Sequence, residues 1–92
     1  VEVEVDCLDG LRIAIEAGAD EVLIDNFTPD QMRVAVALRD EIGPEVRLEA
    51  SGGLTLETAA EVASTGVDYI AVGELTHSVR ALDIGLDWET VI

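Results

Sequence analysis

The sequence contains no lysine, and this absence is the first constraint on function. Arginine supplies all five basic side chains, against twenty Asp and Glu, and the formal net charge is −15 at pH 7. Proteins bind nucleic acids and anionic membranes through clusters of basic side chains. The composition therefore excludes both as partners and predicts an acidic, solvated surface.

Other scarce features narrow the class of protein. The single cysteine, Cys7, cannot form an internal disulfide, which is typical of a reducing compartment and predicts a cytoplasmic location. We expect it to pack among apolar neighbours. No apolar run approaches the roughly 20 residues of a membrane span, and no signal peptide is recognisable. The first residue is not Met and lies in a predicted strand, so we expect the sequence to have been cut from a longer one.

Short β-branched segments alternate with longer amphipathic ones. We expect strands at residues 2–5, 21–25, 46–50 and 69–72, and helices at residues 8–17, 29–42 and 56–65. The helix at 29–42 has the clearest start signal, with Thr28 as N-cap, Pro29 in the first position and Gln31 three residues after the cap. With only three aromatic residues in the chain, the core between these elements must be aliphatic.

This alternation predicts an α/β fold with four parallel strands and right-handed crossovers. A closed eight-stranded barrel needs roughly 250 residues, so this chain supplies about half of one. We expect a single (βα)4-type unit over residues 1–92, either half of a TIM-like barrel or a rearranged open, flavodoxin-like sheet. A bare face carrying Leu23, Leu48 and Ala50 would need cover. A homodimer or larger assembly, or the tail at 82–92, is expected to provide it.

Acidic side chains lie near the carboxyl ends of the predicted strands, where parallel α/β proteins bind ligands. A carboxylate on an inward strand face is costly unless it meets a cation or hydrogen-bond donors. Glu4, Asp25 and Glu49 are therefore candidate ligands for a metal ion or for ribose hydroxyls. Carboxylate oxygens suit magnesium that is bridged to a phosphate. Alternatively these acids are solvated or cap helices, as we expect for Asp6.

Small residues follow the last two predicted strands. Ser51-Gly52-Gly53 joins a strand to a helix, and Gly73 opens the next loop. Backbone N–H groups in such turns can approach an anion, and a helix amino terminus adds partial positive charge. The two loops match the usual phosphate site of α/β barrels, although each could be a plain turn. His77 could donate to the same phosphate or be structural, and Glu74 would oppose it.

In order and spacing, these segments resemble the closing part of quinolinate phosphoribosyltransferase. The resemblance spans essentially the whole chain and rests on Glu2-Val3-Glu4-Val5-Asp6, Leu23-Ile24-Asp25-Asn26, Leu48-Glu49-Ala50-Ser51-Gly52-Gly53, Gly66-Val67-Asp68-Tyr69-Ile70-Ala71-Val72-Gly73, Leu75-Thr76-His77-Ser78 and Ala81-Leu82-Asp83-Ile84. It implies a magnesium-dependent transferase of NAD biosynthesis. Such an enzyme forms nicotinate mononucleotide from quinolinate and phosphoribosyl pyrophosphate, releasing pyrophosphate and carbon dioxide.

The resemblance also implies roles for individual residues. Glu4 and Asp25 match positions directed toward the ribose and the magnesium-pyrophosphate. The positions that hold the 5-phosphate are matched by Ser51, Gly52, Gly53, Gly73 and His77. Glu74 departs from the family, which commonly has a small residue there. The family's basic quinolinate pocket comes from earlier strands, an amino-terminal domain and a neighbouring subunit, and this lysine-free chain has no match for it.

Three functions remain open on the sequence alone. The chain can be the phosphate-binding part of a phosphoribosyltransferase, without turnover by itself. It can be a module that binds phosphoribosyl pyrophosphate or another sugar phosphate. It can also be an engineered or truncated barrel segment with no activity. Turnover with quinolinate, phosphate affinity without turnover, or a cooperative melt with neither would separate the three.

Overall fold

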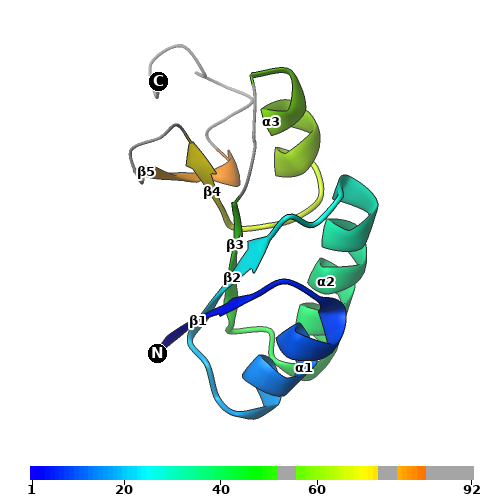
Figure 1. Ribbon diagram of the computed structural model, residues 1–92, viewed down its shortest axis with the longest axis vertical. Helices are drawn as coiled ribbons and strands as arrows, with labels where there is room; N and C mark the ends of the chain where they lie inside the picture. Colours follow the sequence, from blue (N-terminus) through cyan, green and yellow to red (C-terminus); the bar gives the residue numbers. More distant parts are fainter. Residues whose placement is uncertain (52–55, 73–76, 83–92) are drawn as a thin grey trace.

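The computed structural model describes residues 1–51, 56–72 and 77–82, which form a five-stranded sheet with helices on one side (Figure 1). The strands lie side by side in chain order; the first four are parallel, and the fifth is antiparallel to the fourth. The α/β class and the four parallel strands predicted from the sequence are confirmed. The strands are β1 (Glu2–Val5), β2 (Glu21–Asp25), β3 (Arg47–Ser51), β4 (Tyr69–Val72) and β5 (His77–Arg80).

The strand order is that of consecutive strands in an α/β barrel. A flavodoxin-like sheet has β1 between β2 and β3, whereas here β1 lies at an edge. All three helices are on the same side of the sheet (Figure 1), as right-handed crossovers between neighbouring strands require. The described part of the chain therefore has barrel topology in a sheet that does not close.

The antiparallel strand β5 was not predicted. Its pairing runs from Arg80 opposite Tyr69 to His77 opposite Val72. The segment is short and polar, so its own β propensity gives little signal. The edge of β4 offers unpaired N–H and C=O groups, and pairing with β5 satisfies them. The strand therefore depends on its pairing with β4 rather than on its own residues, which is why local pattern alone did not reveal it.

The first helix, α1 (Leu8–Glu16), begins differently from the sequence expectation. Its N-cap is Cys7, whose Sγ accepts a hydrogen bond from the Gly10 backbone N–H at 3.4 Å. The prediction that Asp6 caps this helix was therefore wrong by one residue. The prediction that Cys7 packs among apolar neighbours was also wrong, because Cys7 is exposed. A thiol can replace a carboxylate here because the cap needs only an acceptor.

The second helix, α2 (Pro29–Ile42), begins as predicted. Thr28 Oγ1 accepts from the Gln31 backbone N–H at 3.2 Å, and Gln31 Oε1 accepts from the Thr28 N–H at 2.9 Å. This reciprocal pair is a capping box. The third helix, α3 (Leu56–Ala63), ends two residues before the predicted limit. None of the helices in the described ranges has the length and apolar character needed to cross a bilayer.

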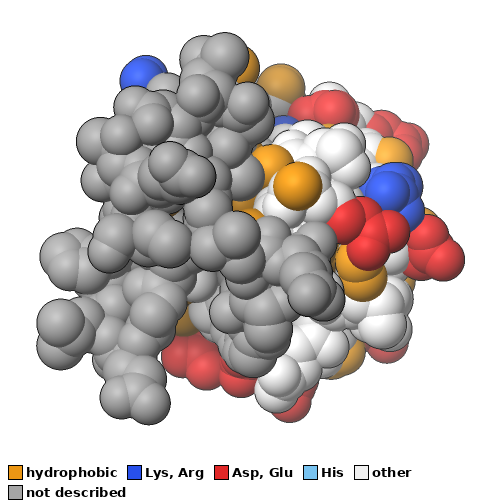
Figure 2. Space-filling view, turned by 90° about the horizontal axis from the view of Figure 1, so that it is seen from above, with side chains coloured by type: hydrophobic (Ala, Val, Ile, Leu, Met, Phe, Trp, Pro, Cys, Tyr) orange, Lys and Arg blue, Asp and Glu red, His pale blue; other side chains and the backbone are white. Residues whose placement is uncertain are grey.

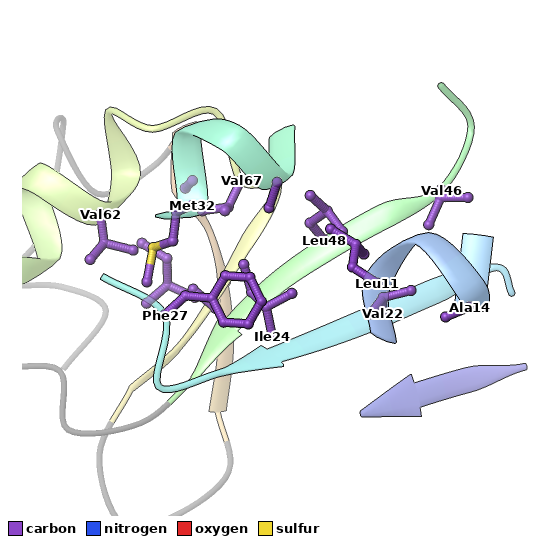
Figure 3. Packing of buried hydrophobic residues seen from close by; sticks show 14 of the residues in the cluster. Leu11, Ala14, Val22, Ile24, Phe27, Met32, Val46, Leu48, Val62 and Val67 are labelled. Atoms are coloured by element: carbon purple, nitrogen blue, oxygen red, sulfur yellow. The ribbon is translucent and has the colours of Figure 1, made fainter. Parts of the chain in front are cut away.

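An aliphatic core fills the space between the helices and the sheet (Figure 3). Leu11 of α1 packs near Val22 and Leu48, all with no exposed surface. Farther along the sheet, Met32 of α2 and Val62 of α3 lie near Phe27 and Ile24 (Figure 3). Burying an aliphatic side chain contributes roughly 1.5–3 kcal/mol, so this layer holds the helices on the sheet.

Arg39, near the end of α2, is a buried charge within this layer. Its Nη1 donates to Asp68 Oδ2 at 2.7 Å and to the Val46 carbonyl at 2.8 Å, and its Nε donates to Asp40 Oδ1 at 2.7 Å. Asp68 Oδ2 also accepts from the Leu48 backbone N–H at 2.9 Å. Burial alone would lower the pKa of Arg39, but hydrogen bonds and charges from Asp68 and Asp40 raise it. The charged guanidinium thus ties α2 to the starts of β3 and β4.

Candidate functional site

The side of the sheet opposite α1, α2 and α3 carries mainly polar side chains, and we call it the helix-free face. Side chains alternate along a strand, so Glu21, Leu23 and Asp25 lie on this face while Val22 and Ile24 are buried beneath the helices. The pairing register arranges the face in rows. From the amino to the carboxyl ends of the parallel strands, the rows are Glu2, Glu21 and Arg47; then Glu4, Leu23, Glu49, Tyr69 and Arg80; then Asp25, Ser51, Ala71 and Ser78.

The sequence analysis placed Leu23, Leu48 and Ala50 on the bare face of the sheet, and this prediction was wrong for two of the three residues. Leu48 and Ala50 are fully buried members of the core between sheet and helices. Leu23 alone lies on the helix-free face, opposite Glu49. The alternation along β3, Leu48-Glu49-Ala50, separates these residues because successive side chains point to opposite faces. The helix-free face is therefore acidic rather than apolar.

The carboxyl ends of β2 and β3 bring two of the predicted site residues into contact. The Ser51 hydroxyl donates to Asp25 Oδ1 at 3.2 Å, and the two residues are direct neighbours in the register. Both are partly exposed. Asp25 is thus oriented by a hydroxyl and lies at the edge where parallel α/β proteins bind ligands.

Glu4, the other predicted acid, lies on β1 on the same face. It is opposite Leu23, one row below Asp25, and it is exposed. No described group of three or more His, Cys, Asp or Glu side chains is arranged to hold a metal ion. Glu4 and Asp25 would fit magnesium in its common mode, in which one or two carboxylates share the ion with substrate phosphates and water.

Asn26, directly after Asp25, has a left-handed backbone with φ of 60°. Asn adopts this region more readily than most residues other than Gly. Its backbone N–H donates to the Ser51 carbonyl at 3.4 Å, so the turn out of β2 stays joined to β3. Asn26 was named only within a motif and was assigned no role from the sequence, although an Asn at a strand end is itself a signal for such a turn.

Three of the predicted phosphate-binding residues, Gly52, Gly53 and Gly73, lie outside the described residues. His77 is the first residue of β5, and its backbone is paired with Val72 at the carboxyl end of β4. Its position is therefore at the same edge of the sheet as Asp25 and Ser51. Of the predicted phosphate site, the described part places Ser51 and the backbone of His77 at one edge.

A shallow cavity lies on the same face, below that edge. It has a volume of about 460 Å³ and is lined by Glu2, Glu21, Leu23, Arg47, Glu49, Tyr69 and Ser78. Acidic side chains are also spread over the described surface seen in Figure 2. Within the cavity, burial raises the pKa of Glu21, and the charges of Glu2 and Glu49 raise it further.

Replacing Glu21 with glutamine should stabilise the protein at pH 7. Glu21 lies directly opposite Glu2, and like charges in such a pair are unfavourable by several tenths to about 1 kcal/mol. A raised pKa means that the folded state holds its proton longer than the unfolded state. The contribution of Glu21 to stability is therefore fully present below the pKa that Glu has in the unfolded state. It is lost as the pH rises through the higher pKa of Glu21 in the folded state.

The test is a comparison of melting temperature against pH for the Glu21→Gln variant and the unchanged chain. The two curves should coincide near pH 3 and separate as pH rises. The matched control is Glu45→Gln at an exposed position, which should give a smaller gap. A Glu21→Gln variant that is less stable at pH 7 would contradict the argument, because it would mean that the attraction to Arg47 outweighs the repulsion.

Comparison with known proteins adds independent information. The family described as quinolinate phosphoribosyl transferase, C-terminal domain, matches residues 1–87. The carboxylating nicotinate-nucleotide pyrophosphorylase of Mycobacterium leprae is 58% identical over 86 residues, which are 94% of this chain and 30% of that protein. The human protein of the same name is 41% identical over 86 residues, 94% of this chain and 29% of its own length. The chain thus spans less than a third of either relative.

Solved structures agree with these matches. The nicotinate-nucleotide pyrophosphorylase from Francisella tularensis superposes with a TM-score of 0.74 at 42% identity, covering 87% of this chain and 28% of that one. The protein of the same name from Ehrlichia chaffeensis gives the same TM-score at 27% identity, covering 87% of this chain and 28% of its own. The fold and the sequence point the same way, and the chain belongs to the quinolinate phosphoribosyltransferase family, within its carboxyl-terminal domain.

Proposed function

We propose that this chain holds the sugar-phosphate part of phosphoribosyl pyrophosphate in a quinolinate phosphoribosyltransferase. The observation that carries the proposal is the contact of Ser51 with Asp25 at the carboxyl edge of the sheet. A carboxylate accepts hydrogen bonds from sugar hydroxyls and repels phosphate, so Asp25 suits the ribose rather than the phosphate. We expect the phosphate at the glycine-rich sequence that follows Ser51, because backbone N–H groups of glycines can approach an anion closely.

The proposed roles follow this division. Asp25 and Glu4 bind the ribose, while Ser51, Gly52, Gly53, Gly73 and His77 bind the 5-phosphate. The chain alone is expected to bind without turnover, because a departing pyrophosphate and a dicarboxylate substrate both need cations. Of the five arginines, Arg39 is buried and paired with Asp68, and Arg33 pairs with Asp30. We expect the remaining cations to come from the part of the full-length relatives that this chain does not span.

Titration with inorganic phosphate and with ribose 5-phosphate tests this proposal. Affinity on the order of millimolar is expected, which corresponds to about 4 kcal/mol, because the net charge of −15 opposes any anion. Gly52→Val should weaken both ligands at least fivefold, since a branched side chain would block approach of the anion to the backbone. Amide chemical shifts of the isotope-labelled chain report the binding.

The matched control for this titration is Ser64→Ala, a hydroxyl in the turn after α3 that donates to the Glu61 carbonyl. It should leave both affinities unchanged. A chain whose amides do not respond to either ligand, or a Gly52→Val variant that titrates like the unchanged chain, would refute the phosphate site.

Magnesium is part of the same proposal, with Glu4 and Asp25 as its protein ligands. The ion would neutralise charge on a pyrophosphate group that both carboxylates approach. In a separate titration with pyrophosphate, magnesium chloride should increase the affinity more than sodium chloride at equal ionic strength, because general screening is common to both salts. Equal effects, or a magnesium effect that survives Glu4→Gln with Asp25→Asn, would argue against these ligands.

Self-association through the helix-free face stays a prediction, and its physical basis has changed. The face carries Glu2, Glu4, Glu21 and Asp25, so two identical copies would bring like charges together. We propose that a homodimer through this face forms only when salt screens those charges. The sugar phosphate remains the partner that the site chemistry favours.

A further inference from the structure

Glu49 is a buried carboxylate on the helix-free face that the proposed function does not yet use. Only 9% of its surface is exposed. It lies in the middle row, between Leu23 of β2 and Tyr69 of β4. A carboxylate at this depth is unfavourable unless hydrogen-bond donors meet it. The Ser78 hydroxyl of β5 is such a donor, and it binds Glu49 Oε1.

The contact between Ser78 and Glu49 crosses β4. Ser78 is paired with Ala71 of β4 in the antiparallel register, and Glu49 belongs to the strand on the other side of β4. The small side chain of Ala71 leaves room for the hydroxyl to reach across. The pairing of β5 with β4 is therefore what brings a donor to this carboxylate.

The surroundings of Glu49 select the kind of ligand. A carboxylate has about four acceptor positions on its two oxygens, and the Ser78 hydroxyl uses one of them. Glu2, Glu21 and Arg47 line the same cavity of about 460 Å³, so with Glu49 it holds three carboxylates against one guanidinium, and its net negative charge disfavours an anion. Sugar hydroxyls donate hydrogen bonds without carrying charge, and vicinal hydroxyls can reach both a carboxylate oxygen and a neighbouring acceptor.

The position of Glu49 matches the extent of a sugar phosphate. Two residues along a strand advance about 6.6 Å, so the row of Glu49 lies that far below the row of Ser51 and Asp25. A phosphate bound at the carboxyl edge would place the ring of the same molecule over the face between these rows. Asp25 and Glu49 would then approach the ring from its upper and lower sides.

We propose that Glu49 is a further acceptor for sugar hydroxyls and that Ser78 is its positioning residue. The Ser78 hydroxyl holds Oε1, which orients Oε2 toward the cavity. This inference rests on the proposed function, because the bound phosphate determines where the ring lies. It extends the sugar subsite from the strand ends down the helix-free face to β5.

The test compares dissociation constants for ribose 5-phosphate and inorganic phosphate across variants of the chain. Ser78→Ala should weaken ribose 5-phosphate about fivefold, the effect of roughly one hydrogen bond, and leave phosphate unchanged. Ser78→Thr should restore most of the affinity because it keeps the hydroxyl. Glu49→Gln should weaken ribose 5-phosphate further, and adding Ser78→Ala to it should have no additional effect. Ser64→Ala is the matched serine control.

Each other outcome counts against the inference in a distinguishable way. If phosphate binds and Ser78→Ala leaves the ratio of the two constants unchanged, Ser78 does not position a sugar ligand, while the phosphate site stands. If Ser78→Ala weakens both ligands equally, its role is structural. If the Ser78→Ala variant does not fold, the Glu49→Gln variant is the test. A ratio of the ribose 5-phosphate and phosphate dissociation constants that this variant leaves unchanged overturns the proposal. If neither ligand binds the unchanged chain, the proposed function fails and this inference fails with it.

Discussion

Replacing Arg39 with methionine is expected to lower the free energy of unfolding by about 3 kcal/mol, the low end of the range for removing one partner of a buried ion pair. Methionine fills similar volume but removes the Arg39 donor from the Val46 carbonyl and from Asp68, which keeps its hydrogen bond from the Leu48 backbone N–H. The Asp68 side chain is 38% exposed, so water recovers part of the loss. The measurement is chemical denaturation at pH 7.

The same helix offers the matched control. Arg33 pairs with Asp30 on the exposed side of α2, and Arg33→Met should change stability by less than about 0.5 kcal/mol. A double-mutant cycle with Asp68→Asn should show that Arg39 and Asp68 are coupled by more than 1 kcal/mol. An Arg39→Met variant as stable as the Arg33→Met variant would show that the buried network contributes nothing to the fold.

Replacing Gly66 with alanine should cost about 3 kcal/mol, from two sources that can be separated. The backbone of Gly66 has φ of +102°, where a Cβ costs roughly 1–2 kcal/mol. A Cβ at this position would also lie 2.9 Å from Val36 Cγ1 of α2. Moving a packed side chain typically adds 1–3 kcal/mol. The second cost exists because the turn after α3 packs directly on α2.

Gly18 isolates the backbone cost. It has a similar φ of +91°, and a Cβ there would meet no atom within 4 Å. Gly18→Ala should therefore cost about 1 kcal/mol. In a Val36→Ala background, Gly66→Ala should lower the free energy of unfolding by less than it does in the unchanged chain, because the contact with Val36 is then relieved. If Gly18→Ala and Gly66→Ala lower the free energy of unfolding by the same amount, the contact with Val36 is not tight in solution.

The fold was largely predictable because its elements carry local signals. β1, β2, β4 and α2 have the predicted limits, and each is bounded by a turn residue or a cap. β5 was missed because its stability comes from the edge of β4 rather than from its own residues. The cap at Cys7 was missed because sulfur is a rare acceptor in that role, while Asp6, a better one, stood next to it.

The site was less predictable, because it depends on which residues lie side by side. Glu4 and Asp25 were identified from charge at strand ends, which is a local pattern. The contact of Ser51 with Asp25 follows from the register of β2 and β3. The contact of Ser78 with Glu49 depends on β5, which was not predicted, so this contact could not be predicted either. The assignment of Leu48 and Ala50 to the wrong face was avoidable, because strand alternation alone excludes it.

The sequential strand order has a consequence for how the chain folds. Val3 pairs with Val22, Val22 with Leu48, and Ala50 with Ile70, so each strand meets the one that is synthesised next. Only one helix separates successive partners from β1 to β4, which keeps the entropy of loop closure low. The sheet can therefore grow one strand at a time from its amino-terminal edge, and within the described residues β5 is the last strand to be added, in the opposite direction.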